Sequence, residues 1–360
     1  MTTEIQIDSV QFLVNGEPTY RGRIHQGRKI EGLLFNSRMV QAIFDDANPA
    51  TADCWRYPDT NVWDPDRNTD EFCVMLPQYR RYGLLGVTVG LQGGGAIYVP
   101  EVYDHYINSA FDRDGTLRPA TCDRLLRVLK AADAAGMVVI VNYFYWKQVE
   151  KLLGESAIVR ATLEATEWLL QTGYRNILVD VYNEFNDGDR ITQSARIHEL
   201  IGAAQEITLN GRRLLVSAST LPPAPLRSGP WAEIVDFYLP HGNDAWARQL
   251  RSNLRQIRAT PAYEANPRPL LINEDSMYVN NLDAAVDEYA SWGFYIQGYG
   301  AGGWDHGRYE WTQHGRESTF EALTGYQTVP VNWSINTGLK RAFFNRLADI
   351  TGSPGADETP

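Results

Sequence analysis

Cysteine is scarce in this sequence of 360 residues, which holds only Cys54, Cys73 and Cys122. The number is odd, and no two of the three have the CxxC spacing that is typical of redox or zinc sites. A disulfide framework and a structural zinc site are therefore disfavoured. We expect three free thiols.

Basic residues are fewer than acidic ones. The chain has 33 Lys and Arg against 44 Asp and Glu, which gives a formal net charge of -11, and no Lys/Arg-rich run is present. Nucleic-acid binders carry basic patches on one face or along one segment. We therefore expect no nucleic-acid partner.

Long apolar runs are absent as well. No run approaches the ~18 residues that a membrane span needs. The N-terminal stretch MTTEIQIDSVQF lacks the basic and apolar regions of a signal peptide. We expect no membrane partner and a cytoplasmic protein, unless a leader was removed before this sequence was written.

Neither a GxGxxG motif after the first strand nor a phosphate-binding P-loop occurs, which disfavours an open, doubly wound nucleotide-binding sheet. After a hairpin with a turn signal at Asn15 and Gly16, strand-like and helix-like patterns alternate. Strands are predicted at 19–24, 85–91, 138–143, 176–182, 213–218, 236–239, 270–273 and 294–298. Helices are predicted at 70–82, 120–135, 156–172, 191–209, 244–259, 282–292 and 339–350. Only the connection after the fifth strand lacks a clear long helix.

Eight strands with intervening helices predict an α/β fold of the (β/α)8 TIM-barrel type, with long loops on the C-terminal face. Such a barrel takes about 250 residues before insertions, so one domain accounts for the chain. We expect a single catalytic domain over 1–350 that includes the N-terminal hairpin. The polar tail 351–360 is expected to be disordered.

Two glutamates follow strands at positions where barrels carry their chemistry. Glu184 ends the fourth predicted strand, in ILVDVYNEFND, and Glu274 ends the seventh, in RPLLINEDS. Two carboxyl groups that flank an acetal can divide the work, because one protonates the leaving oxygen and the other attacks the anomeric carbon or activates water. A separation of roughly 5 Å gives retention of configuration, and about 6.5–9.5 Å gives inversion. Asp275 is the alternative carboxylate if the strand register shifts by one.

These two segments resemble the fourth-strand and seventh-strand signatures of the cellulase-like (clan A) superfamily of retaining (β/α)8 glycoside hydrolases. The resemblance implies that Glu184 is the acid/base, that Glu274 is the nucleophile and that Asn183 binds the sugar 2-hydroxyl. It also implies sugar-contacting positions for His241, in LPHGND, and Trp304, in GAGGWDHG.

The sequence departs from this family on the second strand. Many members carry an Arg there that supports the nucleophile, whereas VTVGLQGGG has none and places Gln92 nearby. Arg21, Arg23 and Arg38 are the candidates to reach in from neighbouring segments.

Further substrate-binding candidates come from the other strand ends. They are polar or aromatic residues that follow predicted strands: His25, Gln92, Tyr143, Tyr145, His241 and Trp304. A structural role is the alternative for His241, since a single histidine without a visible partner is weak evidence. Packing is the alternative for Trp304, although an aromatic face also suits a pyranose ring.

We therefore expect a glycosidase that uses a retaining double displacement on a glycoside or oligosaccharide, with no metal and no cofactor. One alternative is a divalent-metal sugar isomerase that uses Glu184, Glu274 and His241 as ligands. The other is a glycan-binding pseudoenzyme that keeps the cleft without the chemistry. Sugar identity, linkage, endo or exo mode and oligomeric state are beyond the sequence.

Overall fold

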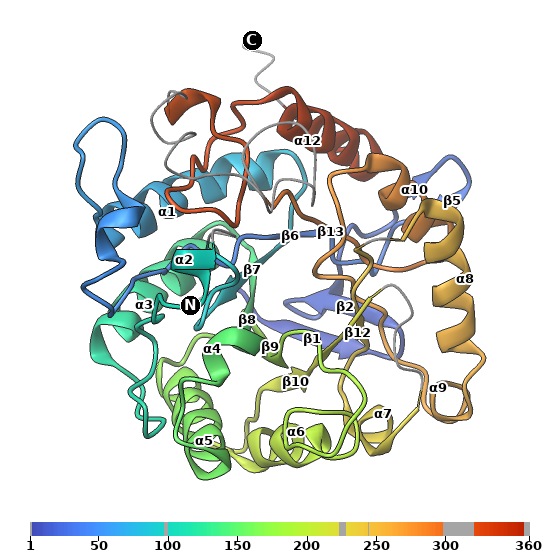
Figure 1. Cartoon of the computed structure of the whole chain (residues 1–360). Helices are drawn as coiled ribbons and strands as arrows, with labels where there is room; N and C mark the ends of the chain where they lie inside the picture. Colours follow the sequence, from blue (N-terminus) through green and yellow to red (C-terminus); the bar gives the residue numbers. More distant parts are fainter. Residues whose placement is uncertain (1, 97–99, 223–227, 244, 298–319, 356–360) are drawn as a thin grey trace.

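The computed structural model describes residues 2–96, 100–222, 228–243, 245–297 and 320–355 and shows parallel strands inside a ring of helices (Figure 1). Six parallel strands form one sheet in the order β10 (Leu215–Ser217), β9 (Ile177–Tyr182), β8 (Val138–Phe144), β7 (Gly86–Gly90), β6 (Asn36–Arg38) and β13 (Gly293–Phe294). β11 (Ser219–Thr220) pairs in parallel with β12 (Leu239–Pro240), and parallel bridges join Tyr238 to Leu270 and Leu271 to Ser291. These pairings close the ring and confirm the predicted (β/α)8 barrel.

The first barrel strand lies later in the chain than predicted. Residues 19–24 mostly form turns, after which β4 (Ile24–His25) pairs with β5 (Arg28–Lys29) as a short hairpin. β6 takes the expected place and pairs with β7 and β13. Its sequence is Asn-Ser-Arg and is entirely buried. A strand made of polar residues gives no hydrophobic signal, which is why the prediction for 19–24 was wrong.

The N-terminal strands close one end of the barrel. β1 (Ile5–Asp8), β2 (Gln11–Val14) and β3 (Glu17–Pro18) form an antiparallel sheet, and the predicted turn at Asn15 and Gly16 joins β2 to β3. Phe12 is fully buried and meets the ring of Phe237 edge-on at 6.1 Å between centroids. It packs in one cluster with barrel residues such as Leu178 and Leu271. In Figure 1 this blue sheet lies across the centre of the ring.

In the described part of the chain, seven long helices surround the strands, each near a predicted position. They are α1 (Pro65–Arg81), α3 (Pro119–Ala134), α5 (Glu155–Gln171), α6 (Ile197–Glu206), α8 (Ala247–Arg258), α10 (Val279–Asp287) and α12 (Gly338–Thr351). α1 starts five residues before its predicted position because the Asp64 side chain accepts hydrogen bonds from the backbone nitrogens of Asp66 and Arg67, and Pro65 suits the first helical position.

Shorter helices lie in the connections. They are η1 (Ala52–Trp55), α2 (Pro100–Tyr103), α4 (Trp146–Val149), α7 (Pro230–Ile234), α9 (Pro261–Ala265) and η3 (Phe320–Ala322). As predicted, the connection after the fifth strand has no long helix among its described residues, where the five residues of α7 are helical.

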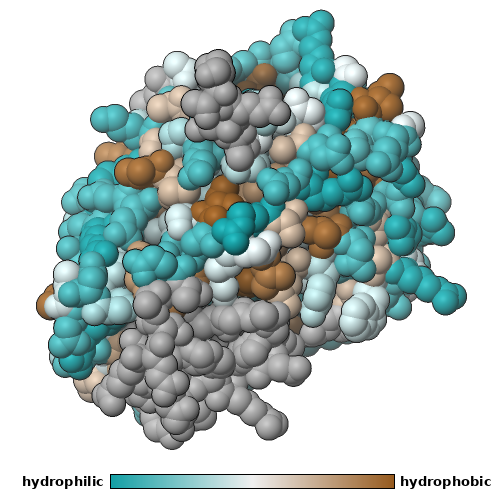
Figure 2. Space-filling model, turned by 90° about the horizontal axis from the view of Figure 1, so that it is seen from above, coloured by the Kyte–Doolittle hydropathy of each residue, from teal (hydrophilic) through white to brown (hydrophobic). Residues whose placement is uncertain are grey.

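The start of the expected disordered tail is attached to the body of the protein. The backbone nitrogens of Ser353 and Gly355 donate to the carbonyls of Ala348 and Arg81. Residues 356–360 lie outside the described residues. The three cysteines are free thiols, as expected. Among the described helices none is long and apolar enough to cross a membrane, and the face seen in Figure 2 is largely hydrophilic, with scattered hydrophobic residues.

We expect Phe12→Ala to destabilise the protein by about 3–5 kcal/mol, because the fully buried ring would leave a cavity beneath the barrel. The urea concentration at the midpoint of unfolding, followed by circular dichroism, measures the effect. Val74→Ala is the matched control, since Val74 lies on α1 with 75% of its surface exposed. Equal midpoints for the two variants would contradict the conclusion that the N-terminal sheet stabilises the barrel by closing one end of it.

Candidate active site

A pocket of about 550 Å³ lies at the carboxyl ends of the barrel strands. Its walls come from loops that follow most of the strands. The residues that line it are Arg38, Tyr103, Tyr145, Trp146, Asn183, Glu184, Leu221, Pro222, Asn243, Ala245, Trp246, Glu274, Asp275, Ser276, Met277, Tyr278, Tyr295, Ile296, Gln297 and Gln327. This is the face where (β/α)8 barrels carry their sites.

Glu184 stands two residues after β9 in a turn that few side chains adopt. Its φ is 62°, in the left-handed region, which costs a residue with a Cβ of the order of 1 kcal/mol. The Glu184 backbone nitrogen donates to Ser219 Oγ at 3.2 Å, and the next nitrogen, of Phe185, donates to the Ser219 carbonyl at 2.9 Å. β11 therefore holds the turn that lifts Glu184 into the pocket. The side chain is 18% exposed.

Glu274 lies deeper and is paired with a cation. Arg38 Nε lies 2.6 Å from Glu274 Oε2, and both side chains are almost completely buried. Asn243 Nδ2 donates to Glu274 Oε1 at 2.6 Å. Burial raises the pKa of Glu274 above its ordinary value, whereas Arg38 and His241 act in the opposite direction. The ion pair with Arg38 favours the carboxylate form.

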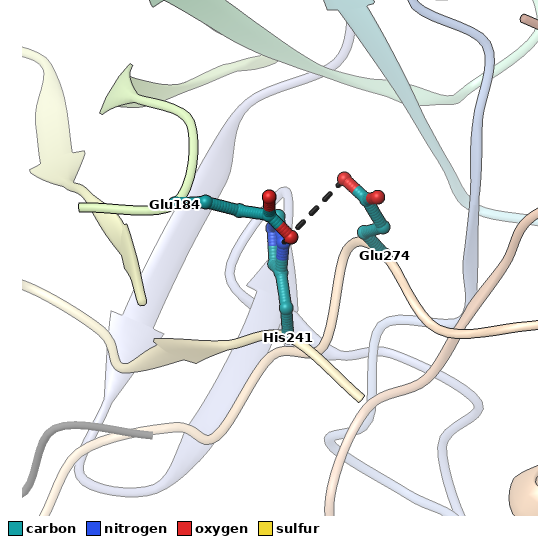
Figure 3. A group of neighbouring side chains, drawn as sticks. All are labelled: Glu184, His241 and Glu274. Atoms are coloured by element: carbon teal, nitrogen blue, oxygen red, sulfur yellow. Dashed lines mark hydrogen bonds and ion pairs between the residues drawn. The ribbon is translucent and has the colours of Figure 1, made fainter. Parts of the chain in front are cut away.

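His241 connects the two glutamates. Its Nδ1 lies 2.9 Å from Glu184 Oε1 and 3.4 Å from Glu274 Oε2, so the three side chains point toward one another (Figure 3). Burial lowers the pKa of His241 to about 4. The ring is therefore neutral near pH 7 and carries one proton.

The position of that proton follows from the other ring nitrogen. His241 Nε2 lies 3.0 Å from Asn273 Oδ1, which is an acceptor, so Nε2 carries the hydrogen. Nδ1 then presents a lone pair to Glu184. A hydrogen bond at 2.9 Å between a lone pair and a carboxyl oxygen requires that Glu184 holds a proton. The surroundings thus favour a protonated Glu184 beside an ionised Glu274.

Among the predicted site residues, Asn183 and Tyr145 line the pocket with the two glutamates. Asn183 Oδ1 accepts a hydrogen bond from Arg38 Nη2. The Tyr145 hydroxyl lies 3.0 Å from that of Tyr103. His241 is completely buried beneath the glutamates and is part of their network.

Three predicted contacts lie elsewhere. His25 is on the β4–β5 hairpin, 3.9 Å from Asp349 near the end of α12, because the strand assigned to 19–24 is not a barrel strand. Tyr143 is buried and its hydroxyl lies 3.0 Å from Thr166 on α5, since alternation along β8 turns it away from the barrel interior. Gln92 accepts from the Tyr145 backbone nitrogen at 3.1 Å and does not line the pocket. Trp304 lies outside the described residues.

Asp275, the alternative carboxylate, has a structural role, because both of its oxygens accept hydrogen bonds from neighbouring side chains. Its Oδ1 accepts from Asn281 Nδ2 at 2.9 Å and its Oδ2 from Trp292 Nε1 at 2.7 Å. Burial raises the pKa of Asp275 to about 6. The neighbouring Gly242 has no room for a side chain, because a Cβ would stand 2.5 Å from Asp275 Oδ2. The register that places Glu274 beside His241 is therefore the one adopted.

Several residues of the site gave little signal in the sequence. Arg38 was one of three candidates to support the nucleophile, but it comes from the first strand, whose sequence is polar. Asn243 and Asn273 lie at the ends of predicted strands, but the sequence shows no partner for either side chain. Trp246 and Tyr278 were missed; their rings stack at 6.2 Å between centroids, with 73% and 49% of their surfaces exposed at the pocket edge. In the sequence, this pair is marked by aromatic residues that follow predicted strands, and their exposure is visible only in the structure.

A metal ion is the alternative occupant of the centre. Glu184, His241 and Glu274 each offer one ligand atom, and these atoms lie within 4.8 Å of one another. However, Arg38 places a positive charge on Glu274, and His241 Nδ1 is bonded to Glu184. The donors already have protein partners, so the set fits a hydrogen-bonded cluster and not a metal site.

No protein-family model matches the chain, and no curated relative of similar sequence matches it. Among solved structures, a GH5-4 broad specificity endoglucanase from Clostridium longisporum aligns with a TM-score of 0.52 and 9% identity over 88% of this chain and 97% of that chain. A β-mannanase from the blue mussel Mytilus edulis aligns with a TM-score of 0.49 and 11% identity over 82% and 91%. At these identities the endoglucanase likeness supports the fold alone.

We expect Arg38→Met to lower stability by about 3–5 kcal/mol at neutral pH, because Glu274 would be left buried without its cation. The loss should grow as pH rises. Without Arg38 the folded-state pKa of Glu274 rises further above the ordinary value of 4.5. Stability from such a group is present at low pH and is lost as pH rises through the folded-state pKa.

Urea unfolding of the wild type and of Arg38→Met between pH 4 and pH 8 measures how the stability loss changes with pH. This range begins near the ordinary pKa of a glutamate and extends above it. The control is the double variant Arg38→Met with Glu274→Gln, which has no carboxylate to ionise. Its stability relative to the wild type should vary less with pH. A loss in Arg38→Met that is the same at every pH would rule out Glu274 as its cause.

Proposed function

We propose that this protein is a glycoside hydrolase that cleaves O-glycosidic bonds with retention of configuration, with Glu184 as acid/base and Glu274 as nucleophile. One observation carries the proposal: oxygens of two differently partnered carboxyl groups lie within 4.8 Å of each other. That spacing is nearer to the roughly 5–5.5 Å of retaining enzymes than to the roughly 6.5–9.5 Å of inverting ones, and it suits a direct attack by one carboxylate. The (β/α)8 fold is that of the family the sequence resembles.

In the first step, Glu274 attacks the anomeric carbon and Glu184 gives its proton to the departing oxygen. The glycosidic bond breaks and a covalent glycosyl-enzyme forms. In the second step, Glu184, now a carboxylate, takes a proton from water, whose oxygen attacks the same carbon and releases Glu274. Neutral His241 suits both steps, since its lone pair can hold the acid proton in place without competing for it permanently.

The residues around the two glutamates fit the roles that the resemblance implies. Arg38 keeps the nucleophile ionised and orients Asn183 through its Oδ1. We assign the Asn183 amide nitrogen to the sugar 2-hydroxyl. Tyr145 and Trp304 remain candidates for contacts with the sugar rings.

A carbohydrate substrate also accounts for the aromatic residues at the pocket edge. Trp246 and Tyr278 lie at one part of the rim and Trp146, 41% exposed, at another. Exposed aromatic rings that gather at the edge of a pocket are typical of ligand-binding sites, and flat rings suit the apolar faces of sugars. The rim can therefore hold sugar units on more than one side of the glutamates.

The metal-dependent isomerase is the second candidate, because three potential ligands converge. The partners of Glu274 and His241 described above weigh against it. A glycan-binding pseudoenzyme would have the same pocket as the glycosidase, but it would bind glycans without cleaving them.

We expect Glu274→Gln to abolish hydrolysis of activated aryl glycosides, since an amide cannot form the glycosyl-enzyme. The assay uses a panel of α and β aryl pyranosides and furanosides, with and without chelator. Glu206→Gln, an exposed glutamate at the end of α6, is the control and should keep wild-type rates. Full activity in Glu274→Gln would exclude its role, and activity that is lost with chelator would favour the metal enzyme.

We expect Glu184→Ala to lower kcat by about 10²–10⁴-fold on substrates whose leaving group needs protonation. On activated aryl glycosides, whose leaving group departs without a proton, azide should restore the rate by attacking the accumulated glycosyl-enzyme without a general base. The product, examined by NMR, should be a glycosyl azide of retained configuration. An azide product of inverted configuration would overturn the double displacement.

A further inference from the structure

Asp180 is a buried carboxylate that the proposed chemistry does not use. It lies on β9, four residues before Glu184, and is completely buried. Leu178, two positions earlier, packs in the cluster beneath the barrel, whereas Val179 and Val181 pack toward the helices. Alternation therefore places Asp180 on the inner face, below the pocket. A buried carboxylate is costly, so its partners reveal its role.

The first set of partners leads to the backbone of Glu184. Asp180 Oδ1 accepts from the Ser219 backbone nitrogen at 2.9 Å, and Oδ2 lies 3.1 Å from Ser219 Oγ. Ser219 Oγ in turn accepts from the Glu184 nitrogen, in the turn with φ of 62°. Asp180 thus fixes the residue that supports the left-handed turn.

The second set leads to the Glu184 carboxyl group. Asn273 Nδ2 donates to Asp180 Oδ2 at 3.2 Å, which leaves Asn273 Oδ1 facing His241 Nε2 at 3.0 Å. The opposite amide orientation would place Oδ1 against the carboxylate, where two acceptors repel. Asp180 therefore selects the Asn273 orientation, and Asn273 selects the His241 tautomer whose Nδ1 accepts from Glu184.

We propose that Asp180 is a positioning residue that keeps the Glu184 carboxyl group protonated, through the hydrogen-bond chain Asp180–Asn273–His241–Glu184, and holds its backbone turn through Ser219. The proposal rests on the assignment of Glu184 as the acid/base. Because the Asp180 carboxylate only accepts hydrogen bonds, it sets the direction of each of the other hydrogen bonds in this series.

Among the described residues, the register partners of Asp180 on the neighbouring strands do not include another carboxylate. Across the strands its register partners are Asn142 and Ser217, neither of which titrates. Burial raises the pKa of Asp180, whereas the Arg38 charge and the hydrogen bonds from Asn273 and Ser219 act in the opposite direction, and the N–H groups of Ser219 and Asn273 both donate to its oxygens. Arg38 is engaged with Glu274 and Asn183, and His241 is the third member of the chain itself.

The test is Asp180→Asn, which keeps the size of the side chain. Its Oδ1 must still face the Ser219 nitrogen, so the new amide nitrogen faces Asn273 Nδ2, and two donors cannot bond. Asn273 should turn over and donate to His241 Nε2, which moves the ring proton to Nδ1. Nδ1–H then donates to Glu184 and stabilises its carboxylate form.

Two results are expected from kinetics. The alkaline limb of the kcat/KM profile should move to lower pH, by about one unit. The rate loss should be about tenfold greater for glycosides with poor leaving groups than for dinitrophenyl glycosides, which leave without a proton. An unchanged alkaline limb with an equal loss for both kinds of substrate would overturn the proposal and leave only a packing role.

One measurement is independent of the proposed activity. Nitrogen-15 NMR of histidine-labelled protein, with the His241 signals assigned through His241→Gln, should show the proton on Nε2 in the wild type and on Nδ1 in Asp180→Asn. The same tautomer in both would overturn the proposal even if hydrolysis is observed. A tautomer change in a protein that cleaves no glycoside would support the chain and refute the glycosidase.

Two further variants complete the test. Asp133→Asn is the matched control: Asp133 is a buried carboxylate on α3 that accepts from the backbone nitrogens of Thr2 and Thr3. It should alter stability without moving the His241 proton or the alkaline limb. Asn273→Ala removes the link between Asp180 and His241 and should shift the alkaline limb downward, which keeps the proposal testable if Asp180→Asn does not fold. An unshifted limb in Asn273→Ala would contradict it.

Discussion

The buried ion pair between Arg38 and Glu274 is the interaction on which the site depends. It joins the first barrel strand to the end of the seventh, so it forms only when the ring of strands is closed. Burying two charges is expensive, and an apolar pair of similar size often gives equal or greater stability. A pair of this kind is therefore better explained by what it does to Glu274, because it favours the carboxylate form in a place where burial favours the neutral acid.

The surroundings of the second glutamate, Glu184, favour the neutral acid instead of the carboxylate. Glu184 Oε1 is hydrogen-bonded to a buried histidine, whose pKa burial lowers to about 4, so that the neutral ring offers it a lone pair. Two chemically identical side chains thus have different surroundings, which favour different protonation states. The asymmetry arises from which strand supplies each neighbour: β6 gives the cation, and the segment after β12 gives the imidazole.

The barrel interior supports this arrangement from below. Polar residues occupy the inner face near the pocket, where Ser219 and Asn273 both donate hydrogen bonds to Asp180. Apolar residues that pack with Phe12 fill the other end. A network of this kind is stable only if every member has a partner, since unpaired polar groups in a low dielectric are costly. The closed N-terminal end places the polar network above an apolar core.

The sequence by itself determined the fold class and the two glutamates. Alternating strands and helices predicted the barrel, and polar residues directly after apolar strands marked Asn183, Glu184 and Glu274, because period and strand ends are local properties that one sequence displays. The first strand was misplaced for the same reason, since β6 is polar and carries no such period.

Only the tertiary structure decided which partners these residues have. Arg38, Asn243 and Asn273 are brought to the glutamates by strand closure across long sequence separations, and no local pattern encodes such a contact. His25 and Tyr143 look equally suitable in sequence, yet they point to α12 and α5. Protonation was beyond the sequence too, because it depends on burial and on the direction of hydrogen bonds, which exist only once the barrel has closed.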